Sequence, residues 1–273
     1  MPTLITVHLV APRRVFLPPF TGEQVRALFF RILGDSEVVV RLHDVPYIRP
    51  YAVKPLYLVN GRKKIVRNGR WIINKDEGLA FEIGVFDPEI EDRILGVLVR
   101  DIGNVVRIKN SEFFVDRIEV FRKSSFEDLF PGKTTSLVGI SFVTPTLFSG
   151  EIKEHIFPDP LSVFGSLLRI WNSFAEDDAK IDEETFLGWV RERVYIRYYS
   201  LKTREAKIKD AKIVGFKGKA AYVIMDPDME EAEYLLALLR FGLISNVGLK
   251  RTYGFGVIKP KDIANNRQIK LHE

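Results

Sequence analysis

The sequence contains no cysteine, which excludes disulfide bonds, thiolate metal ligands and a thiol nucleophile. Only four histidines are present, and their positions show no spacing typical of a metal-ligand set. We therefore expect neither a metal site nor a cofactor.

Long hydrophobic runs are also missing. The longest candidate, residues 234–244, is interrupted by Arg240 and Gly242 and is too short to span a membrane. Residues 1–10 lack a charged n-region and carry His8 inside the apolar stretch, which is not the pattern of a signal peptide. We expect a cytoplasmic protein without a membrane partner.

Positive charge is in excess and clustered. The net charge is +5 and the pI about 9.2, which favours anionic partners such as nucleic acid. Nine bases and one acid lie in residues 41–75, eight bases and two acids in 197–219, and four bases and no acid in 248–261. Such clusters neutralise phosphates. Aromatic residues lie among the bases or close to them, and we expect two or three of them to stack on unpaired bases, the rest facing the core: Tyr47, Tyr51, Tyr57, Trp71, Tyr195, Tyr198, Tyr199 and Tyr253.

The first half of the chain alternates strand and helix patterns. Residues 3–10 are rich in β-branched residues, which favours a strand. Thr21 and Gln24 have capping-box spacing and precede an apolar face with helical periodicity. Asp87 and Pro88 predict the start of a second helix. With strands expected at residues 51–59, 79–86, 105–108 and 113–121, the order is β-α-β-β-α-β.

The second half repeats this order. Residues 224–231 match residues 85–92 as a strand end, an Asp-Pro helix start and an acidic first turn. We expect strands at 134–143, 195–201, 206–214, 220–225 and 255–260, and helices from Asp159, at 182–193 and at 227–241. The prediction is an α+β fold of two tandem ferredoxin-like (RRM-like, βαββαβ) domains, at residues 1–123 and 134–273.

The most specific motif lies between the last expected helix and strand, and reads Asn246-Val247-Gly248-Leu249-Lys250-Arg251-Thr252-Tyr253-Gly254-Phe255-Gly256. Glycine adopts positive φ cheaply and lets another backbone approach closely. Lys250 and Arg251 could meet phosphates together with exposed N–H groups. The spacing is not that of a Walker or Rossmann loop, and a purely structural turn is the alternative.

This loop resembles the C-terminal glycine-rich signature of the RAMP superfamily. Within it, the chain most resembles the endoribonucleases that process CRISPR repeat transcripts. Residues 42–44 (Leu-His-Asp), 141–146 (Ser-Phe-Val-Thr-Pro-Thr) and 157–160 (Phe-Pro-Asp-Pro) agree with this resemblance, which spans nearly the whole chain. Asn246 stands where the family usually has its first glycine, and asparagine tolerates positive φ next best.

The resemblance implies metal-independent cleavage of pre-crRNA. The 2′-hydroxyl attacks the scissile phosphate and leaves a 2′,3′-cyclic phosphate and a 5′-hydroxyl, which needs a base, an acid and cations. His43 follows the first helix, lies in the basic cluster and matches the family, so we expect it to be catalytic. Arg49 falls where some members place a charge-stabilising lysine, and Lys54 is a second candidate. Phe30 stands where those members have a catalytic tyrosine, whose role is lost or passes to Tyr47 or Tyr51.

The resemblance gives CRISPR repeat RNA as the partner, and it leaves a CRISPR effector complex and a homodimer open. A non-catalytic RNA-binding subunit of such a complex is the alternative function, because those subunits share the duplicated fold and the loop. A ferredoxin-like metabolite enzyme is a third alternative and would need a deep pocket. The residues expected to bind RNA are Gly248, Lys250, Arg251, Gly254 and Gly256 in the loop, and Arg62, Lys63 and Lys64 in the first domain.

Overall fold

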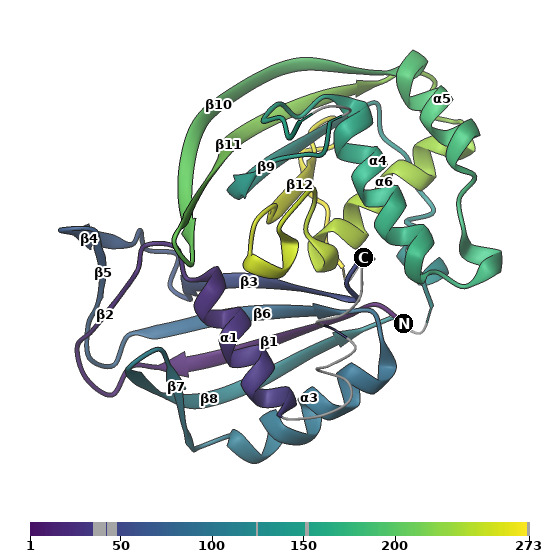
Figure 1. Cartoon of the computed structure of the whole chain (residues 1–273). Helices are drawn as coiled ribbons and strands as arrows, with labels where there is room; N and C mark the ends of the chain where they lie inside the picture. The colour runs from purple at the N-terminus through teal and green to yellow at the C-terminus, as the bar shows by residue number, and fades with distance from the viewer. Residues whose placement is uncertain (35–41, 43–47, 124, 151–152, 272–273) are drawn as a thin grey trace. The chain divides into compact units, whose positions relative to one another are not determined.

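The computed structural model describes residues 1–34, 42, 48–123, 125–150 and 153–271. The chain forms two compact units, drawn in Figure 1. The N-terminal unit comprises Thr3–Arg122 together with Thr252–Gly254. The C-terminal unit comprises Met1–Pro2, Lys123–Arg251 and Phe255–Glu273.

The N-terminal unit is built on a five-stranded antiparallel sheet in the order β3-β6-β1-β8-β7. Helices α1 and α3 pack on one face of this sheet (Figure 1), and Val7, Phe29 and Ile94 lie in the core. The main elements are β1 (Thr3–Val10), α1 (Gly22–Leu33), β3 (Tyr51–Leu58), β6 (Gly78–Val85), α3 (Pro88–Asp101), β7 (Val105–Ile108) and β8 (Ser111–Arg122).

Three further strands of this unit form a small sheet of their own, which we call the accessory sheet. They are β2 (Val15–Leu17), β4 (Ile65–Arg67) and β5 (Arg70–Ile73), in the order β2-β5-β4. Strands β4 and β5 lie in the connection between β3 and β6, so the accessory sheet is an addition to the ferredoxin-like plan.

The C-terminal unit has a five-stranded antiparallel sheet in the order β10-β11-β9-β12-β13. Tyr222 of β11 packs against Phe164 of α4 and donates to the Pro158 carbonyl oxygen at 2.9 Å. The elements are β9 (Leu137–Thr146), α4 (Pro160–Phe174), α5 (Glu183–Arg193), β10 (Val194–Ile208), β11 (Ala211–Ile224), α6 (Glu230–Ser245), β12 (Ile258–Asp262) and β13 (Arg267–Gln268), with 3-10 turns η1 (Glu127–Leu129), η2 (Asp177–Ala179) and η3 (Arg251–Tyr253).

The two sheets have the same strand order. In each βαββαβ unit the second strand pairs with the third, the third with the first and the first with the fourth. The predicted fold class, two tandem ferredoxin-like domains, is therefore confirmed.

Several local predictions were wrong for identifiable reasons. Thr21 makes no capping bond, because its hydroxyl accepts a hydrogen bond from the Leu56 amide at 2.9 Å inside the protein. The three strands expected in residues 195–225 are two long ones, β10 and β11. They pair from Val194 to Ile208 with one register shift between Ile196 and Tyr198, and they turn at Lys209-Asp210. The strand expected at 255–260 is β12 and begins at Ile258, because the glycine-rich loop continues to Gly256.

One buried carboxylate holds both ends of the N-terminal unit's main segment. Glu91 of α3 is 1% exposed. It accepts a hydrogen bond from the Thr3 hydroxyl at 2.9 Å and forms an ion pair with the Arg122 guanidinium. Thr3 and Arg122 also face each other across the β1–β8 pair. The burial of this charge is thus compensated by two polar partners.

Candidate nucleic-acid interface

The glycine-rich loop joins α6 to β12 and is held in a strained path. Asn246, Gly248, Lys250, Gly254 and Gly256 all have positive φ, between 57° and 80°. At Gly256 an added Cβ would lie 1.8 Å from the Val247 carbonyl oxygen, so this position requires glycine. The Asn246 turn survives the replacement of the family's glycine, with φ 57°.

The two cations of the loop have different surroundings. Lys250 is exposed, and its Nζ lies 3.9 Å from a carboxylate oxygen of Glu154. Arg251 is 7% exposed and donates to the Ser245 carbonyl oxygen at 3.0 Å. Lys250 is thus accessible to a ligand, whereas Arg251 stabilises the loop from within.

Residues Thr252–Gly254 of the loop belong to the N-terminal unit, where they pack on α1. The Arg26 guanidinium lies between two aromatic rings, 4.5 Å from the Phe30 centroid and 4.5 Å from the Tyr253 centroid. An added Cβ on Gly22 would lie 1.9 Å from the Tyr253 carbonyl oxygen. The glycine at the start of α1 therefore permits this close approach.

Tyr51 lies at the centre of the same group. It is fully buried, stacks on Phe29 with 4.3 Å between centroids, and meets the edge of Phe30 at 6.0 Å. Burial raises the pKa of Tyr51, and the neighbouring Arg26 and Arg49 charges oppose that rise. The rise moves the pKa of this hydroxyl further above neutral pH than the usual value of 10.0. We call Arg26, Arg49, Tyr51, Thr252 and Tyr253 the loop-tip cluster.

The three predicted catalytic residues have separate positions. His43 lies outside the described residues. Arg49 belongs to the loop-tip cluster, and its Nε donates to the Leu42 carbonyl oxygen at 3.2 Å. Lys54 is 9% exposed and forms an ion pair with Glu82, its partner across the β3–β6 pair. It faces away from Tyr51, because β3 places their side chains on opposite faces of the sheet.

Glu82 also accepts a hydrogen bond from the Tyr57 hydroxyl, at 2.8 Å. Burial and this carboxylate raise the pKa of Tyr57. Lys54, Tyr57 and Glu82 therefore form a compensated polar group of their own.

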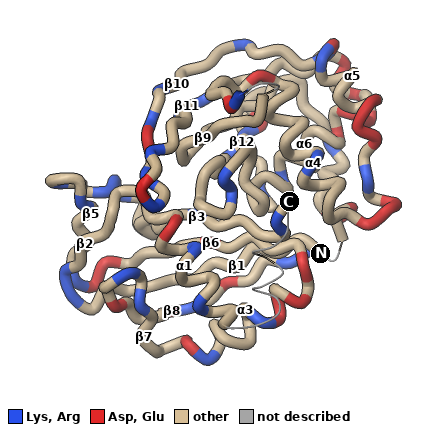
Figure 2. Tube along the Cα trace, viewed as in Figure 1, with Lys and Arg blue, Asp and Glu red and all other residues tan. Residues whose placement is uncertain are grey.

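Bases elsewhere gather on two connections. Arg62, Lys63 and Lys64 lie just before β4, and Figure 2 shows Lys and Arg along the accessory sheet and along β10 and β11, with acids gathered around α5. Of the aromatic residues among these bases, Tyr51 and Trp71 are buried. Tyr195, Tyr198 and Tyr199 of β10 are instead 52%, 52% and 57% exposed. Tyr47 lies outside the described residues.

Arg26 was not predicted as a site residue from the sequence. The signal available was its position four residues before Phe30 on a predicted helix, where the two side chains are neighbours. That Tyr253 covers the other side of the guanidinium depends on a contact between residues more than two hundred positions apart.

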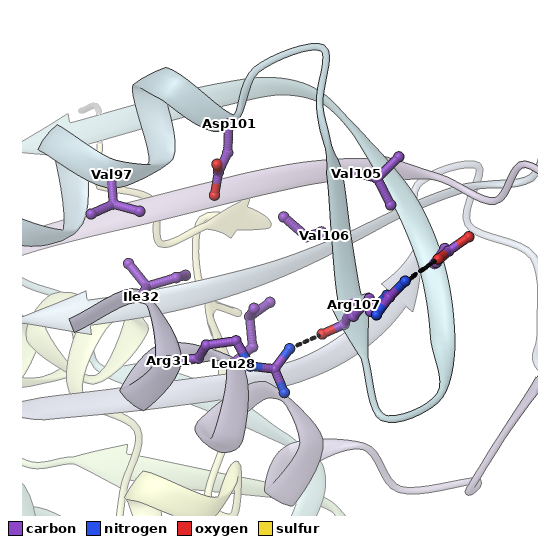
Figure 3. Close-up of a pocket in the computed structure, with 9 residues that line it drawn as sticks. Leu28, Arg31, Ile32, Val97, Asp101, Val105, Val106 and Arg107 are labelled. Atoms are coloured by element: carbon purple, nitrogen blue, oxygen red, sulfur yellow. Dashed lines mark hydrogen bonds and ion pairs between the residues drawn. The ribbon is translucent and has the colours of Figure 1, made fainter. Parts of the chain in front are cut away.

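The described residues also contain a pocket of about 490 Å³ in the N-terminal unit, between α1, α3 and β7. Leu28 and Ile32 line its apolar part. Arg31 donates to the Arg107 carbonyl oxygen at 2.8 Å (Figure 3). The Arg107 guanidinium donates to a carboxylate oxygen of Glu112 at 2.9 Å. No predicted site residue lines this pocket.

In the described part of the chain, His, Asp and Glu side chains do not gather in a group that could hold a metal ion. None of the helices described is both long and apolar enough to cross a membrane.

Residues 140–258 match the family described as "CRISPR-associated endoribonuclease Cas6". A protein of that name from Streptococcus thermophilus is 26% identical over 235 residues, which cover 82% of this chain and 85% of the relative.

Solved structures are similar as well. A Cas6 protein in a product complex has a TM-score of 0.76 and 21% identity, with 95% of this chain and all of that one covered. A Cas6-related protein from Pyrococcus furiosus has a TM-score of 0.64 and 16% identity, with 96% of this chain and all of that one covered.

Proposed function

This chain is a Cas6 RAMP-type protein, and from that premise we propose that it is an endoribonuclease that cuts CRISPR repeat RNA. The observation that carries the proposal is the family match over residues 140–258, which includes most of β9 and the whole glycine-rich loop. The exposed cations and tyrosines described above give the chain a surface suited to RNA.

The reaction we propose needs no metal. The 2′-oxygen forms a bond to the scissile phosphorus while the bond from phosphorus to the 5′-oxygen breaks, giving a 2′,3′-cyclic phosphate and a 5′-hydroxyl. One proton leaves the 2′-hydroxyl and another reaches the departing 5′-oxygen. His43 is our candidate for this proton transfer, since imidazole titrates near neutral pH.

The loop-tip cluster supplies part of what the rest of the reaction requires. Arg49 carries a positive charge that can stabilise the pentacovalent phosphorane. Because Tyr51 is fully buried, we assign to it the positioning of its neighbours Arg26 and Thr252. Tyr47 stays the candidate for the donor role that Phe30 cannot perform. Lys54 is the weaker charge-stabilising candidate, because Glu82 already compensates its charge.

The RNA would be held by the predicted binding residues. Lys250 is exposed at the glycine-rich loop. Gly248, Gly254 and Gly256 give the loop its shape, because an added Cβ at each would meet the protein's own atoms, and Arg251 maintains the loop. Arg62, Lys63 and Lys64 add cations from the N-terminal unit.

The test is single-turnover cleavage of a labelled CRISPR repeat RNA in excess chelator, with product ends mapped. Cleavage should persist and leave a cyclic phosphate. His43→Ala should lower the rate constant by roughly 10²- to 10⁴-fold, whereas the matched control His155→Ala should not. A 2′-deoxy sugar before the cut should abolish cleavage without abolishing binding.

The possible failures are distinguishable. Normal cleavage of the deoxy substrate would exclude the 2′-hydroxyl as nucleophile. Loss of cleavage in chelator would exclude the metal-independent route. Tight and selective binding of repeat RNA with no cleavage by the wild-type protein would favour the alternative function, a non-catalytic RNA-binding subunit.

A further inference from the structure

The accessory sheet of the N-terminal unit has two unlike faces. One face packs on the core through Val15, Leu17, Trp71 and Ile73. Because side chains alternate along a strand, the other face carries the residues between them. On that outer face Phe16 is 48% exposed, and Ile65, which pairs with Ile72, is 51% exposed. The outer face is therefore a partly apolar strip open to solvent.

Arginines lie at both ends of this strip. Arg14 lies 5.7 Å from the centroid of the exposed Phe16 ring. At the other end, β4 and β5 are joined by Asn68 and Gly69, whose φ values of 49° and 67° are those of a tight hairpin turn. Arg67 and Arg70 flank that turn and face each other directly.

This arrangement of charge is costly in isolation. Like charges directly opposite each other in an antiparallel pair are destabilising. Residues 59–75 contain six bases and no acid, and residues 11–19 add Arg13 and Arg14 with no acid. The sheet supplies no carboxylate to relieve the repulsion at the Arg67–Arg70 tip. An anionic ligand bound there would relieve it.

We propose that the outer face of the accessory sheet binds the sugar-phosphate backbone of RNA outside the cut site, without reading its sequence. Paired guanidinium groups suit phosphate oxygens in geometry and charge. The ligand is RNA because of charge complementarity and because the proposed function, on which this inference rests, already brings RNA to the protein. The exposed Phe16 ring provides a face for an unpaired base.

The test compares Arg67→Ala/Arg70→Ala with a matched control, Arg100→Ala/Arg169→Ala, which removes two exposed helical arginines and the same net charge. Affinity is measured over a range of salt concentrations, for repeat RNA and for an unrelated RNA of equal length. The tip variant should bind both RNAs about tenfold more weakly. The slope of log affinity against log salt concentration should become shallower by about 1.5 to 2. Its single-turnover rate at saturating RNA should be unchanged. Arg67→Lys/Arg70→Lys should restore much of the affinity.

Several results would overturn the inference. They are an unchanged salt slope in the tip variant or an equal loss of affinity in the control variant. A reduced rate at saturation with normal affinity would place the arginines at the cut site instead. If the wild-type protein bound RNA but never cut it, the endoribonuclease proposal would fail, yet the same comparison of variants would still decide whether the sheet binds RNA.

Discussion

The connection between the second and third strands of the ferredoxin-like plan is basic in both units, but the two units build it differently. Residues 59–75 of the N-terminal unit and residues 197–219 of the C-terminal unit each carry a net charge of +6. In the N-terminal unit this charge lies on and around an added hairpin, β4–β5. In the C-terminal unit it lies on the lengthened strands β10 and β11 themselves.

The chemistry of the two connections differs more than their charge. In the C-terminal connection, Lys212 lies 3.7 Å from Glu205 and Lys207 lies 3.7 Å from Asp210, so two lysines are compensated locally. Strand β10 begins with the exposed Tyr195, Tyr198 and Tyr199. In the N-terminal connection Lys75 lies 4.0 Å from Asp76, whereas residues 59–74 carry five bases and no acid. We infer that the accessory sheet contacts phosphates, whereas β10 adds stacking on bases.

The largest difference should appear in stability. Gly218 of β11 has φ 143°, and an added Cβ would lie 2.0 Å from the Ser200 carbonyl oxygen. Gly218→Val should lower the free energy of unfolding by about 3 kcal/mol. Gly69→Ala, where nothing lies within 4 Å of the added Cβ, should cost only about 1 kcal/mol. Urea denaturation measures both losses of stability. Equal losses would contradict the view that the β10–β11 hairpin belongs to the core of its unit whereas the β4–β5 hairpin is an addition.

The next effect is on base stacking. Tyr195 and Tyr198 pair with alternate residues of β11, so they share one face of the sheet. Tyr195→Ala/Tyr198→Ala should weaken binding of single-stranded RNA by about 1–3 kcal/mol per stacked base. The salt slope should stay the same, because no charge is removed. Phenylalanine at both positions should restore affinity, and a changed slope would show that the tyrosines act through neighbouring cations.

A smaller effect is expected for the compensated lysines. Lys207→Ala/Lys212→Ala should weaken RNA binding by only about twofold, since their carboxylate partners already offset much of their charge. Titrations in parallel with Arg67→Ala/Arg70→Ala make the comparison direct. A larger loss in the lysine variant would reverse the assignment of phosphate binding to the accessory sheet.

The smallest effect concerns pH. Burial, and then the Arg204 charge, lower the pKa of Lys217 from its usual 10.5. A lysine whose pKa is lower in the folded state costs stability while it is charged, and that cost is lost as the pH rises from the lowered pKa towards 10.5. Lys217→Met should therefore be more stable than wild type at about pH 7, with a shrinking advantage towards about pH 10. An advantage independent of pH would be one of packing alone.

The sequence predicted the βαββαβ order of each unit because that order depends on local patterns, but it did not predict the accessory strands β2, β4 and β5. It failed where a distant residue decides the outcome. The two Asp-Pro octets show this. Asp87 caps α3 by accepting from the Glu89 and Ile90 amides, whereas Asp226 forms an ion pair with Arg193 at 3.2 Å and has φ 52°. As a result α6 begins at Glu230 and not at residue 227.

The candidate site was predictable only in part, for the same reason. The glycine-rich loop was visible as a motif, and so was the proximity of Arg49 to the basic cluster. Three features depend on tertiary contacts that leave no local pattern. They are the burial of Tyr51 beside Arg26 and Thr252, the pairing of Lys54 with Glu82 and the inward orientation of Arg251.

The Glu91 carboxylate holds the two ends of the N-terminal unit's main segment next to each other without a covalent bond. This segment starts at Thr3 and stops at Arg122, and both are bound to the same side chain. Because these ends already lie side by side, a short peptide joining them would bridge little distance and add little loop-closure entropy. A circular permutant of this unit, with Thr3 and Arg122 joined by that peptide and new termini at the exposed Gly61, should therefore keep the same arrangement of strands.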